Sequence, residues 1–351
     1  MSRGRGRSPE QKLDPLAGRL LAVFGVYLMV IAAVACALAW APRDTTFRLH
    51  GHMLGPADIA HRLLHRGLLL GLLLPALLAI ELALEGWNES SLRHLLAQRP
   101  RSAWSDLAVF LFGMLPGHTA VAATLSLGLV LLPARWLHHA LADATGMSIE
   151  LGAWPLAVQV FVLIVVYSFC DYWQHRLDHT ARFWPLHRYH HAAEDFCVLT
   201  SVRVHPAGVT AVIAGVLPAA LIGVSEEALF WLATLIAMLR YVIHTRINSD
   251  FGWIGRWVIQ SPLHHRLHHK LDTTRPTSNF ALTPVWDRLF GTWADETDRR
   301  VPIGVAAPYR QGAWVVPDLL RDYRDFGRAL IGRDHDESGR AQPRVRLNEA
   351  H

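Results

Sequence analysis

Long runs without charged side chains limit the possible folds of this chain more than any other feature of its sequence. Three runs contain no Asp, Glu, Lys or Arg: 20–41, 107–134 and 151–170. A helix of about 20 apolar residues is long enough to cross the hydrocarbon core of a bilayer. Pro116 and Gly117 interrupt the second run, which is therefore either one span or a re-entrant hairpin. These runs predict membrane-spanning helices.

Three further apolar stretches extend this pattern. Residues 67–84 contain Glu81 as their only charged residue, and 204–225 and 228–239 are separated by two glutamates, which predicts a helical hairpin. After this hairpin the chain becomes polar and rich in Trp and His. The sequence therefore predicts an all-α fold, in which a polytopic membrane helical bundle carries a histidine-rich cap.

The overall composition agrees with a membrane protein. Only 18% of the 351 residues are charged and 52% are hydrophobic, whereas soluble domains usually carry about 25% charged residues. The net charge of +5 comes largely from arginine, but no basic stripe is interleaved with aromatic residues, so we expect no nucleic-acid partner. Three cysteines are too few for a disulfide framework, which favours a reducing compartment.

Basic residues beside the runs predict the orientation. The segments 1–19 and 93–101 are rich in arginine and are expected in the cytoplasm. The run 151–170 then returns the chain to that side. We expect a multi-pass protein of a bacterial-type inner membrane whose histidine-rich segment is cytoplasmic. Arg43 and Arg48 go against this orientation, because they lie in a loop assigned to the other side.

Four segments are predicted along the chain. Residues 1–15 form a disordered basic N-terminus, 16–150 hold N-terminal transmembrane helices, and 151–295 form the catalytic domain. The last segment, 296–351, contains an amphipathic helix over 317–330 and a disordered tail.

The amphipathic helix is defined by apolar side chains at helical spacing. Leu319, Leu320, Tyr323, Phe326 and Leu330 lie on one side of it. We expect that side to pack on the catalytic domain or to lie at the membrane interface.

Histidines recur at helical spacing just after the run 151–170. Residues three or four apart on a helix share a face, and neutral imidazole is a good ligand for Fe, Zn, Cu and Ni. A tetrahedral zinc site needs four ligands, so eight histidines are too many for one ion and predict two adjacent ions. The eight are His175 and His179, His187, His190 and His191, and His265, His268 and His269.

Histidines outside these patterns need a separate interpretation. His244, at the end of the predicted hairpin, is a candidate ligand, and for His205 both interpretations stay open. His264 is expected to point away from the ligand face. A lone histidine is more often a hydrogen-bonded polar residue than a ligand, and we apply that interpretation to His50, His52, His61, His65, His94, His118, His138, His139 and His335.

Five motifs between residues 160 and 293 carry a resemblance. They are "DYWQHRLDH", "PLHRYHHAAEDF", "LTSVRVHP", "SPLHHRLHH" and "NFALTPVWDRLFGTW". With them the chain resembles the fatty acid hydroxylase/sterol desaturase superfamily of membrane di-iron oxygenases. The resemblance implies two iron ions, O₂ as co-substrate, and no catalytic residues beyond the metal ligands. The ligands it implies are His175, His179, His187, His190, His191, His244, His265, His268 and His269.

The ligand count departs from the family at one position. Some fatty acyl hydroxylases have a further histidine one turn after the position of His244, where this chain has Asn248. Either Asn248 or a water is a weaker ligand, or His205 contributes instead. Asp171 is a candidate to accept the second N–H of a ligating imidazole.

The resemblance implies an integral membrane enzyme that hydroxylates or desaturates a lipid. A fatty acyl chain, a sterol or a related lipid would fit, and both reactions begin with the same removal of hydrogen. The chain has no Gly-rich dinucleotide fingerprint, haem motif or iron–sulfur cysteine set. Electrons are therefore expected from a separate ferredoxin or cytochrome-type donor served by an NAD(P)H reductase.

Two other functions stay open at this point. A zinc-dependent membrane hydrolase would require a carboxylate beside the metal, as in HExxH, and no such motif occurs. A non-enzymatic metal or electron carrier would place its ligands inside the spans, whereas these histidines lie just outside them.

Overall fold

The computed structural model describes residues 47–49, 52–54, 73–114, 132–205, 211–271, 277–296, 298, 301–306 and 309–332. The chain divides into two compact units, Met1–Ala76 with Leu96–Gln98, and Leu77–Leu95 with Arg99–His351. In the first unit, β1 (Phe47–Leu49) and β2 (His52–Leu54) form an antiparallel hairpin. The other described elements are helical, so the all-α class is confirmed apart from this hairpin.

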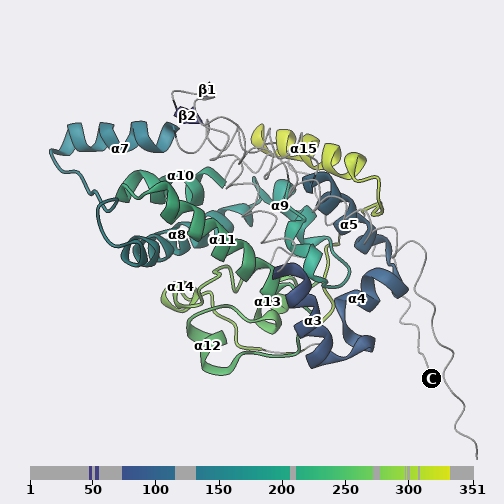
Figure 1. Ribbon diagram of the computed structural model, residues 1–351. Helices are drawn as coiled ribbons and strands as arrows, with labels where there is room; N and C mark the ends of the chain where they lie inside the picture. The colour runs from purple at the N-terminus through teal and green to yellow at the C-terminus, as the bar shows by residue number, and fades with distance from the viewer. Residues whose placement is uncertain are drawn as a thin grey trace, which may run out of the picture. The chain divides into compact units, whose positions relative to one another are not determined.

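The second unit is built almost entirely from helices (Figure 1). Helix α3 (Leu74–Glu85) begins in the first unit and ends in the second. Short helical turns, η2 (Trp87–Glu89), η3 (His94–Gln98) and η5 (Val198–Val202), connect longer elements. The remaining helices are α4 (Ser91–Arg93), α5 (Arg101–Met114), α7 (Leu132–Thr145), α8 (Leu156–Asp178), α9 (Trp184–His191), α10 (Ala211–Ile222), α11 (Glu226–Ile243), α12 (Gly252–Trp257), α13 (Pro262–His268), α14 (Val285–Leu289) and α15 (Val316–Leu330).

Among the described residues, α8 alone is long and apolar enough to cross a membrane. It begins at Leu156, after Pro155, rather than at the start of the apolar run, and it continues past Cys170 to Asp178. The helix therefore reaches the first histidine motif without a break. The run 20–41, the Pro116–Gly117 interruption and the predicted disordered ends lie outside the described residues.

Two helices, α10 and α11, form in the region of the predicted hairpin. Ser225 is the N-cap of α11, and its hydroxyl accepts the N–H of Ala228. Both helices pack against α8. The apolar core between them consists of Leu163, Ile222, Leu232, Ile236, Ile243 and Leu282.

The motif "NFALTPVWDRLFGTW" folds around two buried polar residues. The carboxylate of Asp287 accepts the N–H groups of Phe280 and Ala281 at 2.9 and 2.7 Å. Asn279 has a φ of 57°, and its amide nitrogen donates to the carbonyls of His264 and Ala294. Asparagine tolerates this left-handed conformation better than most residues. Two other bonds hold this segment against α8: the indole N–H of Trp286 donates to the hydroxyl of Ser168 at 2.9 Å, and the hydroxyls of Tyr172 and Thr292 are 3.1 Å apart.

The amphipathic helix forms as α15 and packs on α9. Its buried side carries Asp318, Asp322 and Asp325, which are 3%, 0% and 8% exposed. Of the predicted apolar side, Tyr323 and Phe326 pack on the rings of His205 and Phe183. Leu320 and Leu330 are 61% and 51% exposed.

Candidate metal centre

Four segments carry the histidines of the predicted ligand set. His175 lies in the last turn of α8 and His179 follows that helix; α9 carries three more. His244 ends α11 as its C-cap. Helix α13 begins at Pro262, where Ser261 caps it by accepting the N–H of His264, and it delivers the last three.

The structure brings all nine histidines of that set together. Each offers a ring nitrogen, and within a group these nitrogens all lie within 4.8 Å of one another. We call the two groups the first and the second histidine group. The first group is His175, His179, His187, His191 and His268, and the second is His190, His244, His265 and His269.

Backbone carbonyls orient two rings of the first group. Nδ1 of His175 lies 2.5 Å from the carbonyl oxygen of Phe280, and Nδ1 of His268 lies 2.7 Å from that of Ser278. A carbonyl oxygen only accepts, so each Nδ1 carries the proton and each neutral ring keeps a lone pair on Nε2. The two Nε2 atoms face each other at 3.1 Å. Two lone pairs at this distance repel each other unless a cation lies between them.

The same arrangement recurs in the second group. Nδ1 of His244 lies 2.7 Å from the carbonyl oxygen of Arg240, and Nδ1 of His265 lies 2.8 Å from Oε1 of Gln260. The amide nitrogen of Gln260 donates to the carbonyl of Asn279, which leaves Oε1 as the acceptor for His265. Nε2 of His244 and Nε2 of His265 then face each other at 3.0 Å.

Several other ring nitrogens of the two groups are buried without a hydrogen-bond partner among the described residues. Both nitrogens of His179 and of His191 are in this position, as is Nδ1 of His190 and of His269. A buried polar atom without a partner is costly. A metal ion in each group could bind one ring nitrogen of each histidine, so the residues present fit a pair of ions.

Burial keeps the imidazoles in the form that binds metal. It lowers the pKa of His187, His191 and His268 well below the usual value of 6.5, and neighbouring imidazoles lower the pKa further. The same holds for the second-group residues His265 and His269. These rings are therefore neutral at physiological pH, as a ligand must be.

The two groups lie side by side. The rings of His191 and His269 are stacked with their centroids 4.1 Å apart, and those of His187 and His190 are 5.4 Å apart. The ring of Phe196 packs on His244 and His269 from the second group. Phe196 therefore covers part of the second group with an apolar ring.

A cavity of about 260 Å³ opens onto both groups. His175 and His187 of the first group line it, and so do three histidines of the second. Leu186, Ile243 and Leu282 supply apolar wall. A molecule in this cavity would touch both groups at once.

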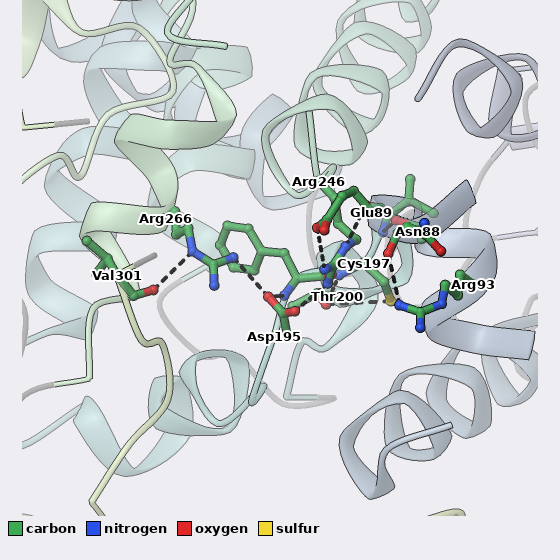
Figure 2. Close-up of polar contacts among 12 residues, drawn as sticks. Asn88, Glu89, Arg93, Asp195, Cys197, Thr200, Arg246, Arg266 and Val301 are labelled. Carbon is green, nitrogen blue, oxygen red and sulfur yellow. Dashed lines mark hydrogen bonds and ion pairs between the residues drawn. The ribbon is translucent and has the colours of Figure 1, made fainter. Parts of the chain in front are cut away.

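Asp195 ties three histidine-bearing segments together outside the centre (Figure 2). It follows α9, and its carboxylate accepts from Arg246, just beyond α11, and from Arg266 in α13. Burial alone would raise the pKa of Asp195, but the two guanidinium groups hold it below its usual value. The sequence analysis gave Asp195 no role, although it lies in the motif "PLHRYHHAAEDF".

The three residues considered beside the nine lie outside both groups. Asp171 accepts from Arg240 at 3.1 Å and from Tyr167 at 3.2 Å. His205 packs edge-on against Tyr323 of α15, with centroids 4.2 Å apart. Asn248 is exposed, and its N–H donates to Glu85. The groups therefore form without them.

Two histidines expected to be ordinary polar residues have partners of that kind. The ring of His264 lies 2.8 Å from the hydroxyl of Ser261 and 3.2 Å from Asp295. His138 lies 2.8 Å from Glu150. Neither belongs to a histidine group.

The comparisons with known proteins agree with this centre. Residues 160–292 match the family model of the fatty acid hydroxylases. This stretch contains all nine histidines, and the resemblance read from the motifs is confirmed, because this part of the chain matches the fatty acid hydroxylase family.

Several curated proteins are similar to part of the chain. Ornithine lipid hydroxylase OlsE of Rhizobium tropici is 29% identical over 52% of this chain and 56% of its own length. The alkylglycerol monooxygenases of Xenopus tropicalis and Danio rerio are 27% and 30% identical, over 41% and 38% of this chain and 33% and 31% of their own length. The chain thus spans about half or less of these relatives. No solved structure matches it significantly.

Proposed function

We propose that the protein is an integral membrane oxygenase that hydroxylates a lipid at a pair of iron ions. The observation that carries this proposal is that unprotonated ring nitrogens face each other. Nε2 of His175 faces Nε2 of His268, and Nε2 of His244 faces Nε2 of His265. Each group contains one such pair, which supports one ion in each. Iron is proposed because the matched family contains lipid hydroxylases and monooxygenases.

The donor set favours an oxygenase over a zinc hydrolase. Both groups consist of imidazoles alone within the described residues, with no carboxylate to act as a general base. Imidazole is also a good ligand for iron.

The protein's own residues would hold the two ions, orient the histidine rings and enclose the centre. The bound iron pair supplies the activation of O₂ and the removal of hydrogen from an unactivated C–H bond. The carbonyls of Phe280, Ser278 and Arg240 keep the protons on Nδ1, so that each Nε2 points at the centre. Phe196 and the apolar cavity wall exclude water and position the substrate.

The substrate class follows from the relatives and the cavity together. The relatives are named for ornithine lipid and alkylglycerol, both of which join an apolar chain to a polar head. The cavity offers the same combination, since it is lined by leucine and isoleucine and by the ion pair of Asp171 with Arg240. We propose a polar membrane lipid as the substrate, hydroxylation as the reaction and a separate protein as the electron donor. The centre would lie at the cytoplasmic end of α8.

Metal analysis combined with lipid analysis tests this proposal. The wild-type chain, His265→Ala and the control His139→Ala, which changes an exposed histidine, are expressed in the same host with a reductase system. Wild type and control are expected to contain two iron ions per chain and to convert one host lipid into a product with one more oxygen atom. His265→Ala is expected to lose iron and to give no product.

Other outcomes contradict the proposal in different ways. One zinc ion per chain, with no change in any lipid, would favour a hydrolase. Iron bound as haem would favour an electron carrier. A lipid that loses two hydrogens would keep the oxygenase site but replace hydroxylation with desaturation.

A further inference from the structure

The C-terminal segment is joined to the histidine helix α9 by a buried network of charges. Nε and Nη2 of Arg188 donate to one oxygen of Asp322 at 2.9 and 2.8 Å, and Nη2 also donates to Asp325 at 2.5 Å. Arg188 is 4% exposed, and the two aspartates of α15 are 0% and 8% exposed. The ion pairs are therefore removed from water.

Two more bonds extend this attachment. The hydroxyl of Tyr309 donates to Asp322 at 2.8 Å. The amide nitrogen of Gln311 donates to the carbonyl of Ala192 at 2.6 Å, directly after the last residue of α9. The segment from Tyr309 to Asp325 thus binds α9 both within the helix and at its end.

Helix α9 occupies a special place in the centre. It supplies His187 and His191 to the first group and His190 to the second. It has eight residues, and isolated helices shorter than about 12 residues are unstable in water. Its orientation must therefore come from contacts with the rest of the protein.

Buried ion pairs are suited to that task. Replacing one by well-packed apolar residues often leaves stability unchanged, but removing one partner leaves an uncompensated buried charge. Such a pair thus favours a single arrangement of its elements over alternatives. Arg188 lies between His187 and His190 in sequence, so an arrangement that satisfies its guanidinium also sets the rotation of α9.

We infer that Arg188, held by Asp322 and Asp325 of α15, is a positioning residue for both metal sites. The C-terminal helix is then a working part of the centre, although it lies outside the stretch 160–292 that matches the family. The inference rests on the proposed function only in that the two histidine groups bind metal.

Metal titration of the full-length chain tests the inference, with Co²⁺ as a spectroscopic probe. Asp322→Asn preserves the volume of the side chain but removes its charge. We expect both ions to bind roughly 10–100-fold more weakly, the range found when groups that orient ligands are removed. The Co²⁺ absorption bands should change with the loss of affinity.

The matched control is Arg324→Gln on the same helix. Arg324 is 58% exposed and lies 3.5 Å from Asp325, and an exposed ion pair contributes little. The Co²⁺ affinity and the spectrum of Arg324→Gln should equal those of the wild type. A wild-type chain that binds no metal would contradict the proposed function itself. A wild type that binds two ions, beside an Asp322→Asn variant of equal affinity and spectrum, would overturn only the inference.

A second variant decides the matter if Asp322→Asn does not fold. Arg188→Lys keeps the charge but cannot bond to both carboxylates with a planar fork. The Co²⁺ affinity of Arg188→Lys should be lower than that of the wild type, with an altered spectrum. Lower thermal stability with unchanged Co²⁺ binding would show that the ion pairs are structural only and would overturn the inference.

Discussion

At the scale of single residues, the hydrogen-bond acceptors next to the histidine rings decide which ring nitrogen can bind a metal. An imidazole can present either nitrogen to a metal, and the acceptor on the opposite side of the ring selects which one. Here the acceptors are carbonyl oxygens of Arg240, Ser278 and Phe280 and the side chain of Gln260. Of these acceptors, the side-chain oxygen of Gln260 is the one that a substitution can remove directly.

Replacing Gln260 by leucine should therefore affect one metal site selectively. Without Oε1, His265 loses the acceptor that holds its proton on Nδ1. We expect the second group to bind its ion roughly 10–100-fold more weakly and the first group to change little. Titration with Co²⁺ would resolve the two sites. Equal weakening of both would contradict this assignment.

The nine ring positions follow from sequence, but the acceptors behind them do not. The spacing of His187, His190 and His191 places three rings on one helix turn, and the pattern repeats at His265. A backbone carbonyl has no signature in the sequence, because every residue has one. Only the folded chain shows that the carbonyl of Phe280 reaches the ring of His175.

At the scale of elements, short helices are held by charges that lie far apart in the sequence. Asp195 joins the segments after α9 and α11 to α13 through Arg246 and Arg266. Arg188 joins α9 to α15. The burial of the acidic side of α15 was not predicted, because an apolar side usually faces the core, whereas Asp322 and Asp325 have a buried arginine as partner.

Asp195→Asn should destabilise the protein in a pH-dependent way. Hydrogen bonds to charged groups contribute about 1.5–3 kcal/mol each, so we expect a loss of that order at neutral pH. Because the folded-state pKa of Asp195 is lowered from 3.8, its stabilising effect is fully present above that value. It is lost as the pH falls through the lowered pKa.

Chemical unfolding of the metal-free proteins would measure this difference. The gap in the free energy of unfolding between wild type and Asp195→Asn should be constant near neutral pH and narrow below about pH 4. A gap that widens at acid pH would contradict the role of Asp195 as an ionised acceptor.

At the scale of the whole molecule, metal binding and folding are linked. Nine histidines from four segments meet in one buried place, where several ring nitrogens have no protein partner among the described residues. An ion that binds only the folded state stabilises it by about 4 kcal/mol at a concentration 1,000 times its dissociation constant. The centre is therefore expected to stabilise the fold when loaded and to weaken it when empty.

Chelation should consequently lower the melting temperature, and added Fe²⁺ under anaerobic conditions should restore it. Thermal unfolding in detergent measures both shifts. A double variant, His265→Ala with His268→Ala, removes one ligand from each group and should show no response to metal. An identical melting temperature with and without chelator would contradict the link.

Among the described residues, α8 is the one predicted span that forms a helix long and apolar enough to cross a membrane. The spacing of His175 and His179 indicated a helix that continues beyond the apolar run, and α8 does continue through Asp171 to Asp178. The structure places Asp171 beside Arg240 of α11, so its charge has a partner within the protein.

The order of synthesis gives the attachment of α15 a consequence for how the protein matures. All nine histidines leave the ribosome before Asp322 and Asp325 are made. A nascent chain can gather its imidazoles at that stage, but Arg188 still lacks its carboxylates, and the rotation of α9 is not yet set. If Arg188 positions both metal sites as we infer, insertion of metal at full affinity is expected to follow the synthesis and docking of the C-terminal helix.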